Sequence, residues 1–477
     1  MRLGELLAGL DVAARTVPLD TEITHLCVDS RQVRKGSLFA AVPGSHCDGG
    51  LYAKQAADRG AVCILCQGQP LPHLPCVAVQ DVRAALAKVA GAWYGHPARK
   101  LTVLGVTGTN GKTTVTYLLR HILTSAGVPT GLIGTVQNLI GERALPARRT
   151  TPDALEIQGL LAQMACGGCT HAVMEVSSHG LDQHRVDGID FAVGIFTNLT
   201  EDHLDYHGTM ERYCAAKAKL FQHCRAAVCN ADDPWTPRLL SGVTCPVTRY
   251  GLTKPADLWA ENLCLEARNV RFTACSARER TGVSLGVPGR FTVYNTLGAM
   301  AACGHLGLSQ RVCAAALESF PGVKGRMEVV PAPGKPYTIL IDYAHTPDAL
   351  ENVLKTVRSF AEKRVIAVFG CGGDREKEKR PVMGQIAAAL ADLAVITSDN
   401  PRREEPIAII RDILPGLSGG KGKWVVEPDR RAAIALAMAE AAPGDVIVLC
   451  GKGHETYQEI GDRMRPMDER EIVRSLL

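Results

Sequence analysis

Gly105–Thr114 reads GVTGTNGKTT, a stretch with three glycines that ends in Gly-Lys-Thr-Thr. The apolar run Leu101–Val106 leads into it, and apolar residues recur at helical spacing in Val115–Ala126, which follows. A strand, a glycine-rich turn and a helix in this order aim backbone N–H groups and the positive end of a helix at one point, where phosphate binds. The stretch therefore predicts a nucleotide phosphate-binding loop.

The residues after the last glycine have the side chains that this chemistry needs. Lys112 is placed to reach phosphate oxygens, and the hydroxyl of Thr113 is placed to bind Mg²⁺. The strict Walker A pattern has a glycine five residues before Gly111, whereas this chain has Val106 there, so the motif is a variant. The residues that we expect to contact nucleotide are Gly108, Thr109, Asn110, Gly111, Lys112, Thr113 and Thr114.

Length and composition indicate a multidomain globular protein. The chain has 477 residues, of which 46% are hydrophobic and 21% charged, enough for about three domains. A net charge of +4 is too small to favour nucleic acid or a membrane surface as a partner. No apolar run approaches the roughly 18 residues of a membrane-spanning helix, and the N-terminal stretch reads as a short amphipathic helix. We expect a cytoplasmic protein.

The 17 cysteines include two Cys-x-x-Cys pairs, Cys63/Cys66 and Cys166/Cys169. Such pairs bind zinc or carry out redox chemistry in some proteins. These two pairs lie far apart in the sequence and have no histidine pair nearby, and most of the cysteines lie in apolar segments. We therefore favour buried free thiols in a reducing compartment.

Alternating strand and helix patterns predict an α/β protein with three domains. We expect a small N-terminal α/β domain at residues 1–98, a central P-loop-type ATPase α/β domain at residues 99–323, and a C-terminal Rossmann-like α/β domain with a parallel sheet at residues 324–477. Residues 255–290 alternate in shorter runs and suggest antiparallel strands.

Polar side chains follow two predicted strands of the central domain. Glu175 ends one strand and His203 follows the next, positions from which they could bind a second Mg²⁺. A capping or surface role is the alternative for each of them. The segment Ser177–Arg185 is rich in polar groups, but no G-x-S-x-G surrounds its serines, and it suits the binding of an anionic substrate.

Eight segments in chain order resemble the motifs of the Mur ligases. The segments are GVTGTNGKTT, MEVSSHGLDQHRV, TNLTEDHLDYHG, GRME, DYAHTPDAL, GCGGDREKEKRP, SDNPR and GKGHE. Within that family the chain is similar to the members that add meso-diaminopimelate. The resemblance implies an ATP- and Mg²⁺-dependent ligase of peptidoglycan precursor synthesis that acts as a monomer on UDP-N-acetylmuramoyl-L-alanyl-D-glutamate.

The resemblance also assigns roles to individual positions. It places the UDP substrate on Ser30, Ser45, His46, Cys47, Thr150, Thr151, Ser177, Gln183 and Arg185, and the adenosine part of ATP near Asn295, Arg326, Asp342 and His345. Lys217 matches a lysine that family members carbamylate, although alone it reads as a helix-surface lysine. A carbamate is an anionic oxygen ligand, so Lys217 would bind Mg²⁺ together with Thr113, Glu175 and His203.

The implied amino-acid site lies in the third domain. It comprises Arg375, Asp399, Asn400, Pro401, Arg402, Gly451 and Glu455. Diaminopimelate is lysine with a distal carboxylate, which Arg402 can bind in bidentate fashion. The implied reaction joins the D-Glu side-chain carboxylate to an amine of diaminopimelate through an acyl phosphate.

Four alternatives remain open from the sequence. The same chemistry could serve L-lysine addition or folylpoly-γ-glutamate synthesis. A partner-binding P-loop ATPase would release phosphate without any amino acid. A dinucleotide oxidoreductase could use the glycines of Gly370–Asp374, although their spacing is not G-x-G-x-x-G.

Overall fold

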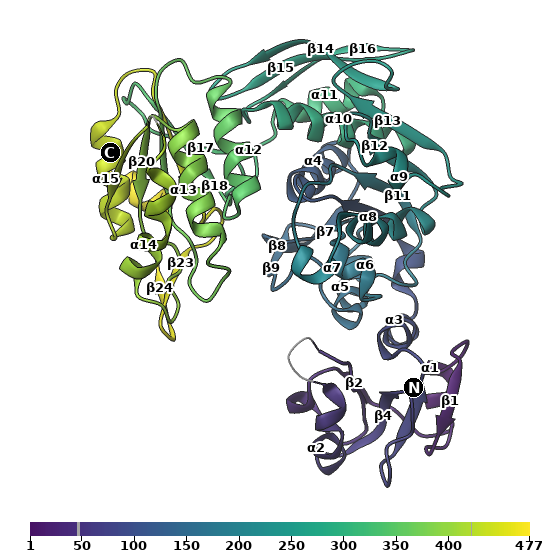
Figure 1. Ribbon diagram of the computed structural model, residues 1–477. Coiled ribbons are helices and arrows are strands. Elements are labelled where there is room, and N and C mark those ends of the chain that lie inside the picture. The colour runs from purple at the N-terminus through teal and green to yellow at the C-terminus, as the bar shows by residue number, and fades with distance from the viewer. Residues whose placement is uncertain (45–47, 421) are drawn as a thin grey trace.

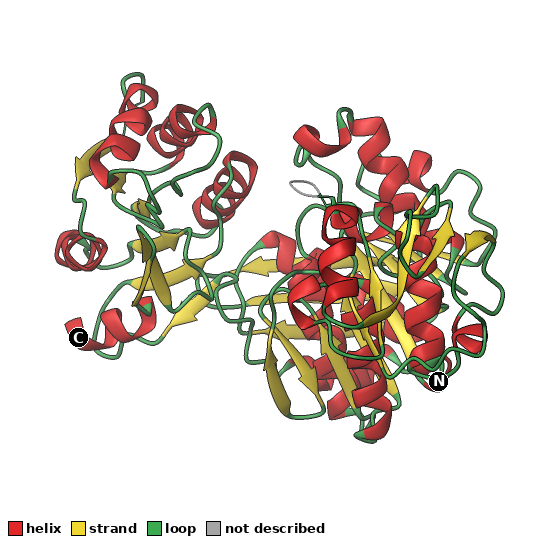
Figure 2. Ribbon diagram, turned by 90° about the horizontal axis from the view of Figure 1, so that it is seen from below, coloured by secondary structure: helices red, strands yellow, loops and turns green. Residues whose placement is uncertain are grey.

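The computed structural model describes residues 1–44, 48–420 and 422–477. Figure 1 shows three bodies that follow one another along the chain, with the C-terminal body beside the middle one and the N-terminal body below it. Each body is an α/β domain built on its own large sheet, and Figure 2 shows the helices packed around the strands. No helix in the described part of the chain is both long enough and apolar enough to cross a membrane.

The first domain contains a sheet with the strand order β1-β5-β4-β3-β2. Its elements are α1 (Leu3–Leu6), β1 (Val12–Arg15), β2 (His25–Cys27), η1 (Ser30–Gln32), β3 (Ser37–Ala40), η2 (Gly49–Tyr52), α2 (Ala53–Asp58), β4 (Ala61–Gln67), β5 (Cys76–Val79) and α3 (Val82–Trp93). The expectation that the N-terminal stretch is helical throughout is wrong beyond Leu6. A left-handed Gly9 with φ +74° follows α1, and Val12–Arg15 then pairs antiparallel with β5.

The middle domain has the sheet order β16-β15-β14-β13-β12-β11-β6-β10-β7-β8-β9. Its strands are β6 (Thr102–Thr107), β7 (Thr130–Ile133), β8 (Gln137–Ile140), β9 (Arg143–Pro146), β10 (His171–Glu175), β11 (Phe191–Phe196), β12 (Ala227–Asn230), β13 (Val247–Gly251), β14 (Leu258–Leu265), β15 (Val270–Ser276) and β16 (Arg280–Leu285). Its helices are η3 (Pro97–Lys100), α4 (Lys112–Ser125), α5 (Ala154–Cys166), α6 (Ser178–Asp182), α7 (Leu204–His207), α8 (Met210–Ala218), η4 (Lys219–Gln222), α9 (Thr236–Leu239), α10 (Arg290–His305) and α11 (Gln310–Leu317). The predicted antiparallel strands are confirmed, because β15 pairs antiparallel with both β14 and β16.

The third domain has the sheet order β17-β18-β22-β19-β20-β21 and a separate hairpin, β23–β24. Its strands are β17 (Glu328–Val330), β18 (Thr338–Asp342), β19 (Val365–Phe369), β20 (Leu393–Ile396), β21 (Lys423–Val426), β22 (Val446–Cys450), β23 (Tyr457–Ile460) and β24 (Arg463–Pro466). Its helices are α12 (Pro347–Arg358), α13 (Lys379–Leu390), α14 (Pro406–Leu417), α15 (Arg430–Glu440) and α16 (Glu469–Leu476). The predicted parallel sheet holds for β18 to β22, whereas β17 pairs antiparallel with β18 at the edge.

Strand side chains alternate between two cores in the third domain. Ala367 packs in the core that contains residues of α12, α13 and α14, whereas Ile366 and Val368 pack with residues of α15 and α16. This alternation follows from the two-residue period of a strand and buries both faces of the sheet. The C-terminal ends of the parallel strands are thereby left on one open rim.

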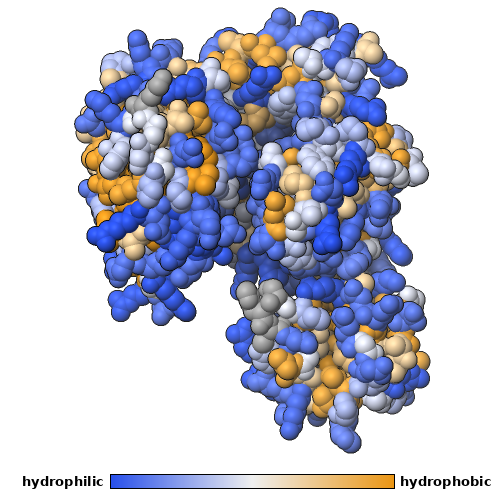
Figure 3. Space-filling model, in the orientation of Figure 1, coloured by the Kyte–Doolittle hydropathy of each residue, from blue (hydrophilic) through white to orange (hydrophobic). Residues whose placement is uncertain are grey.

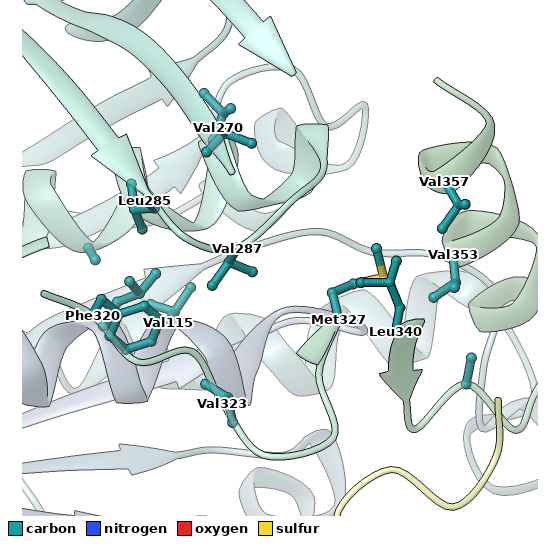
Figure 4. Close-up of a cluster of buried hydrophobic side chains, with 14 of the residues drawn as sticks. Val115, Val270, Leu285, Val287, Phe320, Val323, Met327, Leu340, Val353 and Val357 are labelled. Carbon is teal, nitrogen blue, oxygen red and sulfur yellow. The ribbon is translucent and has the colours of Figure 1, made fainter. Parts of the chain in front are cut away.

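The middle and third domains share one hydrophobic core through the segment that joins them. Val287 and Phe320 of the middle domain, Val323 and Met327 of the connection, and Leu340 of β18 are buried in one cluster. Figure 4 shows Val323 near Phe320 of the middle domain, and Met327, further along the connection, beside Leu340 of β18. Burying these side chains holds the connection against both domains, so it is not a free linker.

Helices α13 and α14 approach so closely that a side chain is excluded at Gly416. A Cβ atom there would overlap the carbonyl oxygen of Pro381 on α13, whereas a Cβ at Gly419, just beyond α14, would meet nothing within 4 Å. We expect Gly416→Ala to lower the free energy of unfolding by about 1–3 kcal/mol, because the helices must separate. Gly419→Ala is the control, and urea unfolding is the measurement. Equal midpoints for the two variants would contradict this packing.

Candidate active site

The glycine-rich loop joins β6 to α4, as predicted. Gly108 and Gly111 have φ values of +151° and +85°, which favour glycine. A Cβ atom at Gly108 would overlap the hydroxyl of Thr197, and a Cβ at Gly111 would lie 2.5 Å from Oδ1 of Asn295. The loop is therefore packed against the C-terminal end of β11 and against α10, and its remaining free face is available to a phosphate.

Lys112 folds back over the loop that precedes it. Its Nζ donates hydrogen bonds to the carbonyl oxygens of Gly108, at 2.9 Å, and Thr109, at 2.8 Å. Burial lowers the pKa of Lys112, and the nearby carboxylates of Glu175 and Asp202 oppose that shift. The ammonium is thus held at the mouth of the loop, where a phosphate chain would replace the carbonyls as its partner.

Glu175 is fully buried at the end of β10, which pairs with β6, so that Glu175 lies beside Val106 in the register. Its carboxylate accepts hydrogen bonds from the hydroxyls of Thr113 and Thr135, each at 3.0 Å, and from the backbone N–H of Thr135 at 2.8 Å. The sequence predicted Glu175 at the end of a strand near the phosphate loop, and the structure places it there. The sequence did not predict Thr135, which no motif marks.

Lys217 lies on α8 and is 1% exposed. Its Nζ donates to the carbonyl oxygen of Gly108 at 2.9 Å and lies 4.3 Å from the ring centroid of Tyr213. No carboxylate forms an ion pair with Lys217 among the described side chains. Burial, and next the charge of Lys112, lower the pKa of Lys217 well below its usual value. Lys217 is therefore a buried amine beside the phosphate loop whose charged form is disfavoured by its surroundings.

His203 caps α7 in the left-handed conformation, with φ +54°. Burial lowers its pKa, Asp202 raises it, and the charges of Lys112 and Lys217 lower it further. His203 thus lies within electrostatic range of both lysines. In the described parts of the chain no group of three His, Cys, Asp or Glu side chains is arranged to hold a metal ion.

Arginines gather around Gln183 at the side of the site that faces the first domain. The side-chain oxygen of Gln183 accepts from Arg185 at 2.6 Å and from Arg83 of α3 at 3.1 Å. Arg185 also donates to the carbonyl oxygen of Thr151 at 2.7 Å. Burial lowers the pKa of Arg185, and the charges of Arg149 and Arg83 lower it further. This excess of positive charge suits an anionic substrate.

Other predicted substrate residues connect this side to the loop. Thr150 and Thr135 share a hydroxyl hydrogen bond of 3.0 Å, which links the Thr150–Thr151 pair to Glu175. The backbone N–H of Ser177 donates to Thr151 Oγ1 at 2.9 Å. Ser30 lies apart in the first domain, where it donates to Gln55. The predicted residues Ser45, His46 and Cys47 lie outside the described residues.

The predicted nucleotide residues of the third domain cluster at its junction with the middle domain. Asp342 is buried at the end of β18, where burial raises its pKa and the N–H of Met327 donates to it at 2.8 Å. The guanidinium of Arg326 lies 4.9 Å from the ring centroid of Tyr343, and His345 bonds the carbonyl of Tyr343. Within the described residues, Nε of Arg326 is buried without a hydrogen-bond partner, as a ligand site would leave it.

A cleft of about 1320 Å³ separates the middle and third domains. Figure 3 shows the hollow between the two bodies, with hydrophilic side chains along its edges. His203 lines it from the middle domain, and the third domain contributes His345, Arg375, Asp399, Asn400, Arg402, Gly451 and Glu455. The structure thus gathers most of the predicted amino-acid site on one wall, opposite residues 201–205, which follow β11.

Three family models match the chain: the Mur ligase family catalytic domain over residues 22–94, the Mur ligase middle domain over residues 106–303, and the Mur ligase glutamate ligase domain over residues 325–453. Two curated relatives are named UDP-N-acetylmuramoyl-L-alanyl-D-glutamate–2,6-diaminopimelate ligase. That of Geobacillus thermodenitrificans is 45% identical and covers 95% of this chain and 94% of its own. That of Gloeobacter violaceus is 46% identical and covers 100% and 98%.

Solved structures give the same picture of the fold. A structure titled as the 2,6-diaminopimelate ligase superposes with a TM-score of 0.72 at 32% identity, covering 100% of this chain and 98% of the other. The MurF ligase of Thermotoga maritima, solved in complex with ADP, has a TM-score of 0.64 at 20% identity and covers 96% of this chain and 97% of its own. The second likeness concerns the fold alone.

Asp348, near the start of α12, joins the third domain to the phosphate loop. Its Oδ2 accepts from Asn110 Nδ2 at 3.0 Å and from Thr200 Oγ1 at 2.9 Å. We expect Asp348→Ala to increase the population of more open arrangements, because these bonds bridge the cleft, and a larger radius of gyration by X-ray scattering would show it. Glu351→Ala, which removes an exposed carboxylate paired with Lys355 on the same helix, is the control. Identical scattering of both variants would refute the bridging role.

Proposed function

Because the chain belongs to the Mur ligase family, we propose that it is the ATP-dependent ligase that joins meso-2,6-diaminopimelate to the D-Glu side-chain carboxylate of UDP-N-acetylmuramoyl-L-alanyl-D-glutamate. The observation that supports this proposal is the cleft, in which Arg402 and Glu455 of the third domain line one wall and Asp202 and His203 of the middle domain line the other. A guanidinium and a carboxylate on one wall suit an amino acid with a distal carboxylate and a distal ammonium. We further propose that it acts as a monomer in the cytoplasm.

In this reaction the D-Glu carboxylate attacks the γ-phosphorus of ATP, which gives an acyl phosphate and ADP. An amine of diaminopimelate then attacks the acyl carbon and expels inorganic phosphate, which leaves the new amide. Lys112 lies where it can neutralise charge on the transferred phosphoryl group. Arg185 and Gln183 would hold the muramoyl substrate, and Arg83, which the sequence did not mark, adds a third group to that side.

The residues beside the loop fit Mg²⁺. Oγ1 of Thr113 and Oε2 of Glu175 are hard oxygen donors that lie 3.0 Å apart at the mouth of the loop. When bound there, Mg²⁺ would neutralise phosphate charge. An ammonium at Lys217 would repel the ion, whereas a carbamate on the same Nζ would supply an anionic oxygen.

The environment of Lys217 supports carbamylation. Carbamate forms when a neutral amine adds to CO₂ and loses a proton, and burial beside Lys112 favours the neutral amine. Carbamylation would remove the positive charge of Lys217, and the resulting anion would compensate the neighbouring charge of Lys112. We therefore propose that the working enzyme carries a carbamate at Lys217 and that this group, Glu175 and His203 hold the second Mg²⁺.

The first experiment measures phosphate release with ATP, Mg²⁺ and the muramoyl dipeptide, with meso-diaminopimelate or L-lysine added in parallel. We expect release only with diaminopimelate, because Arg402 has a carboxylate to bind in that amino acid and would face an ammonium in lysine. Release with lysine instead would keep the ligase reaction and reject this amino acid. Release that needs neither amino acid would favour a partner-binding ATPase.

The second experiment tests Lys217. We expect Lys217→Ala to lower kcat on the order of a hundredfold or more, because a ligand to the metal contributes several kcal/mol to catalysis. Short carboxylates added to the buffer should restore part of the activity. Lys219→Ala, which removes a half-exposed lysine paired with Asp182, is the control. Full activity of Lys217→Ala, or no rescue by any carboxylate, would count against the carbamate.

A further inference from the structure

The hairpin β23–β24 packs against the loop that contains Arg402. The N–H of Arg402 donates to the carbonyl of Glu459 at 3.0 Å, and the N–H of Gly461 donates to the carbonyl of Arg402 at 2.6 Å. Arg402 has a φ of +51°, which a residue with a side chain seldom adopts. The hairpin therefore holds the backbone of Arg402 in a conformation that it would not choose alone.

The same hairpin also holds the side chain of Arg402. Its Nε donates to Oε2 of Glu459 at 3.0 Å, and its Nη1 donates to the carbonyl of Gly373 at 2.7 Å. Hydrogen bonds of Nη2 are not found within residues 1–44, 48–420 and 422–477. Arg402 lines the cleft, whereas Glu459 is not among the described residues that do. Glu459 thus occupies Nε and the carbonyl of Gly373 occupies Nη1, so Nη2 is the guanidinium nitrogen left for a ligand.

Glu459 is also connected to the other end of the amino-acid site. Its backbone N–H donates to Oδ1 of Asn400 at 2.9 Å, and Asn400 Nδ2 donates to Oε2 of Glu455 at 2.9 Å. The buried Nζ of Lys452 donates hydrogen bonds to both Asn400 Oδ1 and Glu455 Oε2. Glu459 thereby connects the guanidinium of Arg402 with the carboxylate of Glu455 through Asn400. These hydrogen bonds fix the separation of the two side chains.

A neighbouring pair shows what an incidental surface contact looks like here. Arg403 and Asp462 approach to 3.9 Å, with side chains 80% and 92% exposed. The side chains of Arg402 and Glu459 are 24% and 33% exposed, and their 3.0 Å contact is accompanied by main-chain bonds. Exposed ion pairs contribute little to stability and leave their side chains free to move. Partly buried pairs that form several hydrogen bonds hold their side chains in one orientation.

We propose that Glu459 is a positioning residue for the selection of the incoming amino acid. It holds Nε of Arg402 so that the guanidinium meets a distal carboxylate of the substrate with its Nη end, at a fixed distance from Glu455. The substrate class that this arrangement takes is an amino acid with a second carboxylate at its far end. The inference rests on the proposed function and adds to it the residue that orients its selective group.

Steady-state kinetics of two variants test the role of Glu459. We expect Glu459→Ala to raise KM for diaminopimelate about tenfold, the order seen when a residue that orients a binding group is lost, with kcat and KM for ATP nearly unchanged. Glu459→Gln keeps an oxygen that can accept from Nε and should stay within about threefold of the wild type. Asp462→Asn, which removes a carboxylate from the turn of the same hairpin, is the matched control.

The outcomes separate the inference from the proposed function. A wild-type protein that does not ligate diaminopimelate would overturn both. A wild-type protein that does, beside an unchanged KM in Glu459→Ala, would overturn the inference alone. If both Glu459 variants showed a lower kcat, a higher KM for ATP and a lower melting temperature to the same extent, the role of Glu459 would be structural and the inference would be overturned. A rise in KM for diaminopimelate that Glu459→Gln restores is the supporting result.

Discussion

The constraint on which the site depends is the buried carboxylate of Glu175, which lies near the half-buried Lys112 at the loop that the buried Lys217 contacts. Charges without water must be matched by partners or be neutralised, and the hydroxyls of Thr113 and Thr135 satisfy Glu175 only as hydrogen-bond donors. Lys112 and Lys217 donate hydrogen bonds to carbonyl oxygens of the loop and, among the described residues, not to a carboxylate. In the proposed function, a polyphosphate, Mg²⁺ and an anionic group on Lys217 would complete this centre.

The shared core explains why the amino-acid site can work opposite this centre. Val323 and Met327 are buried between the middle and third domains, so the third domain is attached by packing as well as by the chain. Asp348 adds a polar contact between the third domain and the phosphate loop. The shared hydrophobic core and the Asp348 contacts attach the third domain at two places, which limits the directions in which the cleft can close. Closure would keep an acyl phosphate from water.

Under the proposed function, selectivity in the third domain would depend partly on Glu459, which is outside the described lining of the cleft. In the proposed reaction Arg402 would bind the distal carboxylate, and the β23–β24 hairpin holds its backbone and its Nε. Lys452 and Asn400 hold Glu455 in the same way. The binding groups are thus presented at fixed spacing, which is how a site distinguishes amino acids that differ by one charged group.

Local patterns alone determined the phosphate loop, the strand that ends in Glu175, the antiparallel strands of residues 255–290 and the mostly parallel third sheet, because strand period and glycine-rich turns are properties of neighbouring residues. They misjudged the N-terminal stretch, where pairing with β5 outweighs helical spacing. Tertiary structure decided the burial of Lys217 and the roles of Arg83, Thr135 and Glu459. Each of these depends on a hydrogen-bond partner distant in the sequence, and only the folded topology brings such partners together.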